Sequence, residues 1–174
     1  SNDKTKGGAV FAPLIIRDVI KEFNEVRIDT LFFKYKDLWN LIFDFEFSQP
    51  SYCKIDSISN AIEINSISQL IIWLCKNLKN YNLVISHGIW SFIFMISSLL
   101  CIVKKKPFCF QPHGSLDPFD INKKKKLIKY FIGYSIYRII FSYSSGIIFT
   151  SNLESSRSKT FGVKVKKFVA RELS

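Results

Sequence analysis

The sequence has 174 residues, of which 48% are hydrophobic and 16% aromatic, and this composition excludes an intrinsically disordered chain. A chain of this length suffices for one domain and can bury roughly 70% of its unfolded surface. Lysine and arginine number 25 against 14 acidic residues, and the net charge of +11 favours anionic partners such as phosphates, anionic lipids or nucleic acids. The charge alone does not choose among these partners.

The first part of the chain predicts a helix followed by a strand. After the pair Gly7-Gly8, apolar residues recur at helical spacing from Phe11 to Phe23. Residues 26–32 then alternate between the two faces of a β-strand. Residues 34–65 have no clear pattern beyond a turn.

From residue 66 onward, helical and strand patterns alternate. Helices are expected over residues 66–81, 89–106 and 123–143, with a further helix opening at Ser151. Short apolar strands are expected over residues 82–86, 107–110, 146–150 and 165–170. This alternation predicts an α/β fold: one Rossmann-like domain over residues 1–174, with a parallel sheet of about five strands and helices on both faces.

The uncharged window from Leu83 to Val103 is long enough to span a bilayer if His87 is neutral. The tripeptide "SHG" interrupts it, so a buried helix after Gly88 is the better interpretation.

The cysteines lie in or beside apolar segments and lack the spacing of metal ligands, so we expect no metal site. We expect small buried hydrophobic side chains in a reducing, cytoplasmic compartment. These residues are Cys53, Cys75, Cys101 and Cys109.

Both histidines of the chain follow an apolar strand and precede a glycine: His87 in "NLVISHG" and His113 in "PFCFQPHG". Ligands of open parallel sheets bind outside the carboxyl ends of the strands. Ser151 follows the next strand, so we expect these three residues at one rim of the sheet. Gly7 and Gly8, at a helix start, could bring backbone N–H groups to a phosphate at the same rim.

Each of these features also has a plain structural explanation. The glycine pair could be an ordinary turn, and either histidine could be a hydrogen-bonded residue at a strand end. Trp90 could belong to the core, Asp117 before Pro118 could shape a turn, and Ser151 with Glu154 has the spacing of a helix capping box.

The sequence "KKKKLIKYFIGYSIYRIIF" (123–141) leads a lysine run into an aromatic helix. One interpretation is a solvated basic face. The other is contact with an anionic membrane surface, because basic residues are attracted to anionic lipid and aromatic rings prefer the interface. The basic residues concerned are Lys123, Lys124, Lys125 and Lys126, and we expect Tyr130, Tyr134 and Tyr137 to share one stripe.

The segments "GGA", "EVRIDTL", "NLVISHGIWSF", "PFCFQPHGSLDPF" and "GIIFTSNLES" occur in this order. Over most of residues 6–170 the chain resembles the N-terminal, acceptor-side domain of GT-B glycosyltransferases of family 4. The resemblance implies retaining transfer of a sugar from a nucleotide-sugar donor to a glycan or lipid-linked acceptor, in bacterial surface polysaccharide biosynthesis. It implies no cofactor and no metal, and a cytoplasmic protein that can be peripheral at the inner face of the membrane.

By this resemblance His113 is the catalytic residue, which hydrogen-bonds the transferred sugar or polarises the reacting centre. Gly7 and Gly8 would approach the donor diphosphate or the acceptor, and His87, Trp90 and Asp117 would line the acceptor side. The other implied substrate-binding residues are Gly114, Ser151 and Glu154.

The chain departs from the family pattern because a strand before Gly7-Gly8 and a C-terminal donor-binding domain are absent from it. We therefore expect the isolated chain to be inactive, as an excised or truncated domain. The alternative function is a non-catalytic, basic scaffold domain associated with a membrane. A nucleic-acid-binding module is a weaker alternative, because no helix-turn-helix, zinc finger or RNP signature is present, and no specific nucleic acid is expected.

Overall fold

The structure is a computed structural model that describes residues 29–33, 61–123 and 125–170. The chain divides into two compact units, Ser1–Leu70 and Ile71–Ser174. In the first unit, β1 (Thr30–Phe33) pairs in parallel with β2 (Ala61–Ile64). The strand predicted over 26–32 is thus found in part. The predicted first helix, Gly7, Gly8, Cys53 and Lys124 lie outside the described residues.

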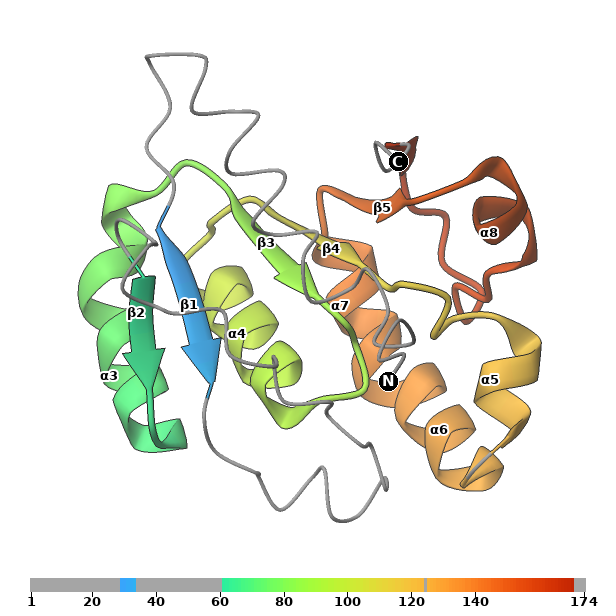
Figure 1. The fold of residues 1–174 in the computed structure, drawn as a ribbon, viewed down its shortest axis with the longest axis horizontal. Helices are drawn as coiled ribbons and strands as arrows, with labels where there is room; N and C mark the ends of the chain where they lie inside the picture. The colour runs from blue at the N-terminus through green and yellow to red at the C-terminus, as the bar shows by residue number, and fades with distance from the viewer. Residues whose placement is uncertain (1–28, 34–60, 124, 171–174) are drawn as a thin grey trace, which may run out of the picture. The chain divides into compact units, whose positions relative to one another are not determined.

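The second unit contains a four-stranded parallel sheet in the order β3-β4-β5-β6, and Figure 1 labels β3, β4 and β5. Its strands are β3 (Val84–His87), β4 (Phe108–Gln111), β5 (Gly146–Phe149) and β6 (Lys167–Val169). The predicted fold class is confirmed: the protein is α/β, with a parallel sheet flanked by helices as in Rossmann-like folds. That residues 1–174 form one domain stays a prediction.

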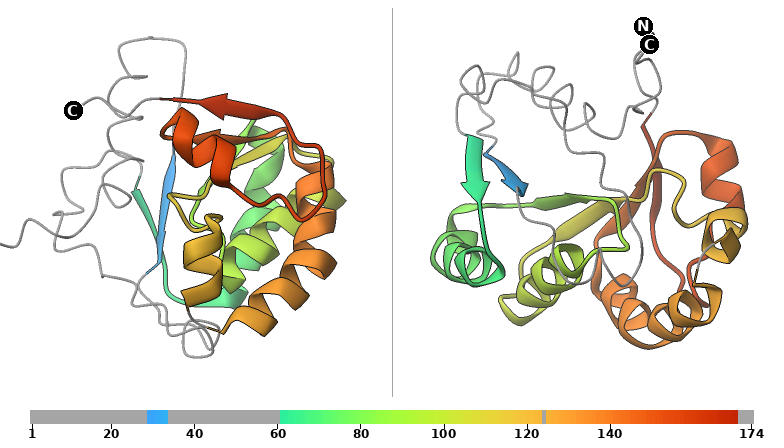
Figure 2. Two further views of the ribbon diagram at one scale, coloured as in Figure 1. Left: turned by 90° about the vertical axis from the view of Figure 1, so that its right-hand side faces the viewer. Right: turned by 60° about the horizontal axis from the view of Figure 1, so that its bottom comes forward.

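The helices connect successive strands. They are α3 (Ile67–Asn77) with a 3-10 turn η3 (Leu78–Asn80), α4 (Phe92–Val103), α5 (Pro118–Lys123), α6 (Lys126–Ile132), the π-helical segment η4 (Gly133–Tyr137), α7 (Arg138–Tyr143) and α8 (Asn152–Arg157). Three of these helices begin at a serine whose hydroxyl accepts a backbone N–H, namely Ser66, Ser91 and Ser151. Figure 2 shows α4 and α7 on the same face of the sheet.

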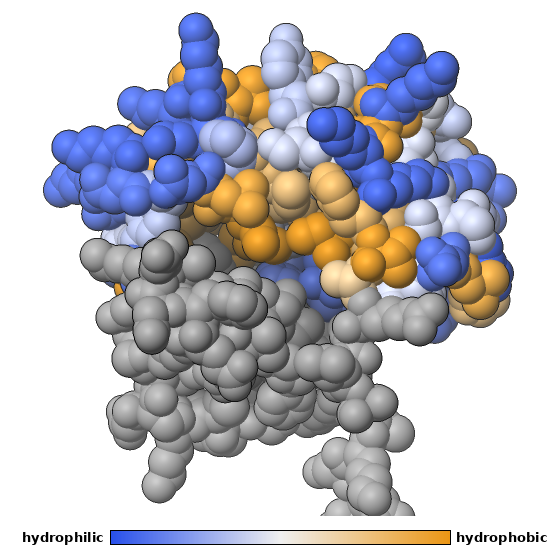
Figure 3. Space-filling view, turned by 90° about the horizontal axis from the view of Figure 1, so that it is seen from above, coloured by the Kyte–Doolittle hydropathy of each residue, from blue (hydrophilic) through white to orange (hydrophobic). Residues whose placement is uncertain are grey.

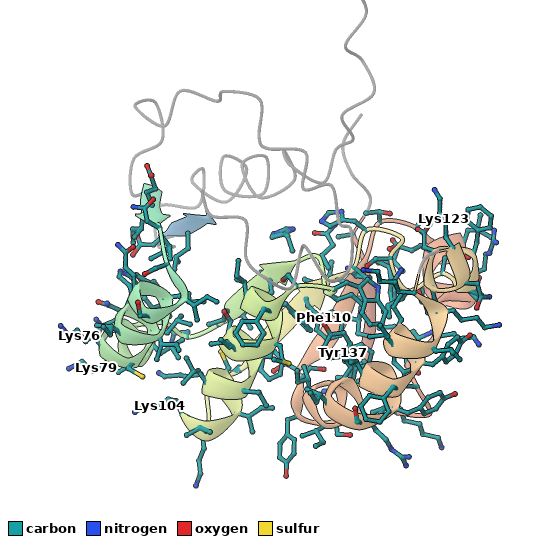
Figure 4. The ribbon with its side chains drawn as sticks, turned by 90° about the horizontal axis from the view of Figure 1, so that it is seen from below. Lys76, Lys79, Lys104, Phe110, Lys123 and Tyr137 are labelled. Carbon is teal, nitrogen blue, oxygen red and sulfur yellow. The ribbon has the colours of Figure 1, made fainter. Side chains whose placement is uncertain are left out.

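Aromatic side chains fill the space between the sheet and this helical layer. Phe110 of β4 contacts Phe94 of α4 and Phe141 of α7, with ring centroids 5.3 and 4.8 Å apart. Tyr137 is fully buried beside them, and Figure 4 shows Phe110 and Tyr137 inside the unit while the labelled lysines point outward. Because strand residues alternate between faces, Gln111 belongs to the face of the sheet opposite α4 and α7.

The expected continuous helix over 123–143 is wrong in detail. Lys123 closes α5, where a cation suits the helix dipole, and Lys125 has a left-handed φ of 50° between α5 and α6. The π-helical segment that follows changes which side chains lie on the same side of the helix. Tyr130 and Tyr134 stack with centroids 6.2 Å apart, but Tyr137 leaves their stripe and enters the core, because each π turn holds more residues than an α turn.

Two expectations about apolar segments have different outcomes. Among the described residues, no helix is long and apolar enough to cross a membrane, and α4 is a 12-residue helix that buries one side. Cys101 and Cys109 are buried and free, and burial raises the pKa of the Cys101 thiol to about 11. Cys75 is exposed, which corrects the expectation that it is buried: it lies on the outer side of α3.

Apolar side chains also reach the described surface. Figure 3 shows hydrophobic side chains gathered in the middle of the face seen from above, with hydrophilic side chains around them. The surface is therefore basic without being uniformly polar.

Candidate functional site

The two histidines meet at the carboxyl ends of β3 and β4. Nδ1 of His87 lies 3.1 Å from Nε2 of His113, and the rings are stacked with centroids 5.4 Å apart. The parallel register places His87 opposite Gln111, and the following Gly88 N–H donates to the Gln111 carbonyl at 2.9 Å. The sequence prediction that these strands deliver both histidines to one rim is confirmed.

The backbone turns sharply just after each strand. Gly88 and Gly114 have φ of 73° and 79°, which glycine adopts without steric cost. His113 itself has φ of 49°, a left-handed conformation that is uncommon for a residue with a Cβ atom. Such a conformation persists only where surrounding contacts hold it, and it is often found at functional sites.

Four contacts hold the loop that carries His113, and each comes from a different residue. Trp90 donates its indole N–H to the Ser115 carbonyl at 2.9 Å, and the Lys159 N–H donates to the Leu116 carbonyl at 3.0 Å. Glu154 accepts from the Gly114 N–H at 2.6 Å, and Arg157 pairs with Asp117 at 3.0 Å. We call residues 112–117 the histidine loop.

Asp117 also organises the start of α5. One carboxylate oxygen accepts the Phe119 N–H at 2.8 Å, while the other meets Arg157. With Pro118 at the first helical position, this is an ordinary helix start. The polar atoms of Asp117 are thus engaged within the loop and its supports.

Glu154 and Ser151 make different hydrogen bonds at the start of α8. Ser151 is the N-cap and accepts the Glu154 N–H at 3.1 Å. The Glu154 carboxylate reaches back one residue further than in a capping box, to the N–H and hydroxyl of Thr150, each at 2.8 Å. Its other oxygen binds Gly114, so the start of α8 and the histidine loop are joined by one side chain.

Gln111 has a buried side chain beside the histidine pair in register, and its exposed fraction is only 2%. Its Oε1 atom has no hydrogen-bond partner in the described part of the chain. Buried polar atoms are nearly always hydrogen-bonded, so an orphaned acceptor at a strand end calls for an explanation. The atom is itself covered, so a ligand could reach it only after the residues over it move.

The histidine pair has a defined electrostatic character. Burial, followed by the charge of His113, lowers the pKa of His87 from 6.5 to about 4, so His87 is neutral at pH 7. One facing nitrogen must donate and the other accept, and the tautomers of the two rings are therefore coupled. A proton gained by either ring changes the hydrogen bonding of both.

The predicted site residues fall into three groups. His87, His113 and Gly114 lie together at the rim. Trp90, Asp117 and Glu154 support the histidine loop, and Trp90 is buried, with its ring centroid 5.1 Å from that of Tyr137. Ser151 is exposed as a helix cap, and Gly7 and Gly8 are not described.

Three contributors to this site were not predicted from the sequence: Gln111, Arg157 and Lys159. Gln111 carried a weak signal, since an amide that ends an apolar strand is unusual. Arg157 and Lys159 had none, because their contacts with the histidine loop depend on the tertiary fold.

Within the described ranges, no group of three histidine, cysteine, aspartate or glutamate residues lies together to hold a metal ion. Comparisons of the chain with family models, curated proteins and solved structures found no match.

Proposed function

We propose that this chain is the acceptor-side domain of a GT-B type glycosyltransferase that resembles family 4. It would take part in retaining transfer of a sugar from a nucleotide-sugar to a glycan or lipid-linked acceptor in bacterial surface polysaccharide biosynthesis. The single observation that carries the proposal is the contact between His87 and His113 at the carboxyl ends of adjacent parallel strands. The Rossmann-like sheet supports it, because such sheets bind ligands at this edge.

The proposed role of His113 is to hydrogen-bond the transferred sugar or to polarise the reacting centre. Its left-handed backbone and the contacts around the histidine loop fix where its ring points before any ligand arrives. Preorganised donors lower a barrier because they need no reorganisation during the reaction.

His87 is proposed as a positioning residue that acts through His113. Because burial keeps His87 neutral, it can share a proton with His113 without placing a second charge beside it. Trp90, Asp117 and Glu154 would keep the loop in place rather than touch the substrate.

The proposed setting is the cytoplasm, at the inner face of the membrane when the acceptor is carried on a lipid. The net charge of +11 supports this setting, because the inner leaflet is anionic. The second candidate, a non-catalytic basic scaffold, is favoured by the same charge but does not account for the paired histidines.

The proposal can be tested by following the ring nitrogens of the two histidines in ¹⁵N-¹H correlation spectra. A panel of nucleotide-sugars and short glycans is titrated into the protein at constant pH. We expect saturable shifts of both rings with at least one glycan, and loss of these shifts in His113→Ala. If no saccharide or nucleotide-sugar changes either ring while the protein remains folded, the scaffold function is the better one.

A further inference from the structure

The outer surface of α5 and α6 carries large apolar side chains that the core does not use. Phe119 is 68% exposed, Leu127 83% and Phe131 76%. Leu127 and Phe131 are four residues apart on α6 and therefore share one side of that helix. The helix α5 packs against α6, as Figure 1 shows, and Lys129 joins them by donating to the Asp120 carbonyl at 2.8 Å.

Three lysines border these side chains. Lys123, Lys125 and Lys126 are all exposed, and the Lys123 ammonium lies 5.9 Å from the centroid of the Phe119 ring. No ion pair joins any of the three to an acidic side chain of the described residues. We call Phe119, Leu127 and Phe131 together with these three lysines the α5–α6 surface.

The core is complete without this surface. Ile132, Tyr137 and Ile140 supply the buried contacts of the segment, and Lys129, the other lysine of α6, is itself buried with its ammonium 5.5 Å from the Trp90 ring centroid. Both α6 and α7 have one buried side and one exposed side, and Leu127 and Phe131 lie on the exposed side of α6. Folding of the unit therefore gives no reason for three large apolar side chains to stay exposed.

The pairing of these side chains with lysines indicates the occupant. Large exposed apolar groups mark interaction surfaces, and aromatic and aliphatic side chains beside basic residues suit the boundary between headgroups and acyl chains. A nucleic acid would be held by the lysines, but it offers nothing that would bury Leu127. An anionic bilayer would both bury the apolar side chains and bind the lysines.

We propose that the α5–α6 surface docks on an anionic lipid bilayer. Phe119, Leu127 and Phe131 enter the headgroup boundary, and the lysines lie against lipid phosphates. This docking does not depend on the chemistry of the histidine pair, and its test has no catalytic step.

The chain supplies a matched control at the end of α4. Val103 is 74% exposed and is followed by the exposed residues Lys104 and Lys105, but no aromatic residue lies among these three. Figure 4 shows Lys104 well away from Lys123. Substitutions at this place change charge and exposed apolar area without touching the α5–α6 surface.

The test is co-sedimentation of the protein with phosphatidylcholine vesicles that contain or lack phosphatidylglycerol, at low and moderate salt. We expect binding that requires phosphatidylglycerol and weakens with salt. The triple variant Lys123→Gln, Lys125→Gln, Lys126→Gln should bind roughly 100-fold more weakly, since each lysine contributes about fivefold. The triple variant Phe119→Ser, Leu127→Ser, Phe131→Ser should lose at least about tenfold through lost burial of apolar area.

The control variant Val103→Ser, Lys104→Gln, Lys105→Gln should bind as the parent does. Circular dichroism checks that all variants fold. A Phe131→Trp variant adds a fluorescence signal that reports contact with the bilayer directly and does not rely on a loss of binding. Brominated lipids should quench the added tryptophan beyond the parent signal, whereas a tryptophan at Val103 should not be quenched.

Several results would overturn the proposal. They are equal binding to neutral and anionic vesicles, no binding to either, or an equal loss in the Val103 control. Tighter binding to a DNA duplex than to anionic vesicles, or self-association lost in the serine variant without any vesicle binding, would assign the surface to another occupant.

Discussion

The carboxylate of Glu154 and the backbone N–H of Gly114, forty residues apart in the chain, are joined by a 2.6 Å hydrogen bond. The same carboxylate accepts the N–H and hydroxyl of Thr150. One side chain at the start of α8 therefore fixes both the end of β5 and the loop that carries His113. Positioning of the histidine pair depends on this contact across the carboxyl edge of the sheet.

Glu154→Ala should destabilise the protein by about 2–6 kcal/mol, because two partly buried N–H groups lose their acceptor at about 1–3 kcal/mol each. Urea unfolding at pH 7 measures the change. Ser151→Ala is the matched control, since it removes only the N-cap of the same helix and should cost about 1 kcal/mol. A loss for Glu154→Ala no larger than that for Ser151→Ala would show that the carboxylate does not hold the histidine loop.

The free energy of unfolding should fall as the pH is lowered from about 6.5 to about 4. In this window the unfolded chain binds a proton at His87, but the folded chain does not, because burial and His113 lower the pKa of His87 to about 4. Protonation thus favours unfolding, by up to roughly 3 kcal/mol at the acid end. The contribution of His87 is fully favourable above its unfolded pKa.

Urea unfolding of the parent and of His87→Gln across this pH range isolates the effect, because the carboxylates contribute equally to both. As the pH falls, the free energy of unfolding should decrease less for His87→Gln than for the parent. Parallel curves would mean that His87 titrates alike in the folded and unfolded chains.

Under the proposed function, sugar transfer by a protein that joins this chain to a donor-binding domain should depend strongly on His113. His113→Ala should reduce transfer roughly 100- to 1000-fold, the usual cost of removing one positioned hydrogen bond to a developing charge. Cys75→Ala should behave as the parent, because Cys75 is exposed on α3, outside the histidine site. The His113→Asn substitution should keep the loop folded, because asparagine tolerates the left-handed backbone. The loss of transfer in this variant therefore measures the contribution of the imidazole alone.

A positioning role for His87 makes a separate prediction for the pH dependence of transfer. His87→Gln should shift the pH profile of transfer while retaining more activity than His113→Ala, because it changes the proton balance of His113 and leaves its ring in place. An unchanged pH profile of transfer would show that His87 has only a structural role.

Gly133→Ala should destabilise the protein by about 1–3 kcal/mol, the usual cost of overpacking. A Cβ atom at this position would overlap the ring of Phe161, which packs directly on the glycine. The double variant with Phe161→Ala should show a coupling energy, because the clash is absent once the ring is removed. Strictly additive losses in thermal or urea unfolding would contradict this contact.

The features predicted correctly from the sequence are those with a local signature. Short apolar runs that alternate with helical periodicity predicted β3, β4 and β5 within one or two residues of their observed bounds. Because parallel strands end at one edge, the meeting of His87 and His113 followed from their positions at two strand ends.

The features that were missed depend on contacts between distant residues. The ion pair of Arg157 with Asp117 and the burial of Lys129 leave no trace in periodicity. Helix α5 had a local signal in Asp117-Pro118, a cap followed by proline at the first position, but the lysines after it favoured a later start. The π-helical segment breaks the expected tyrosine stripe, and the Phe161 ring that packs on Gly133 within it comes from a distant part of the chain.

The five residues of that segment, Gly133–Tyr137, have a consequence for how the protein can change over time. Deleting one of them would remove the π turn and restore ordinary helical winding, because a π turn holds about one residue more than an α turn. The helices α6 and α7 on either side would keep nearly the same faces toward the core, so Leu127 and Phe131 would stay outside. The segment can therefore absorb a change of one residue in length, and substitutions at these exposed positions of α6 leave the core unchanged.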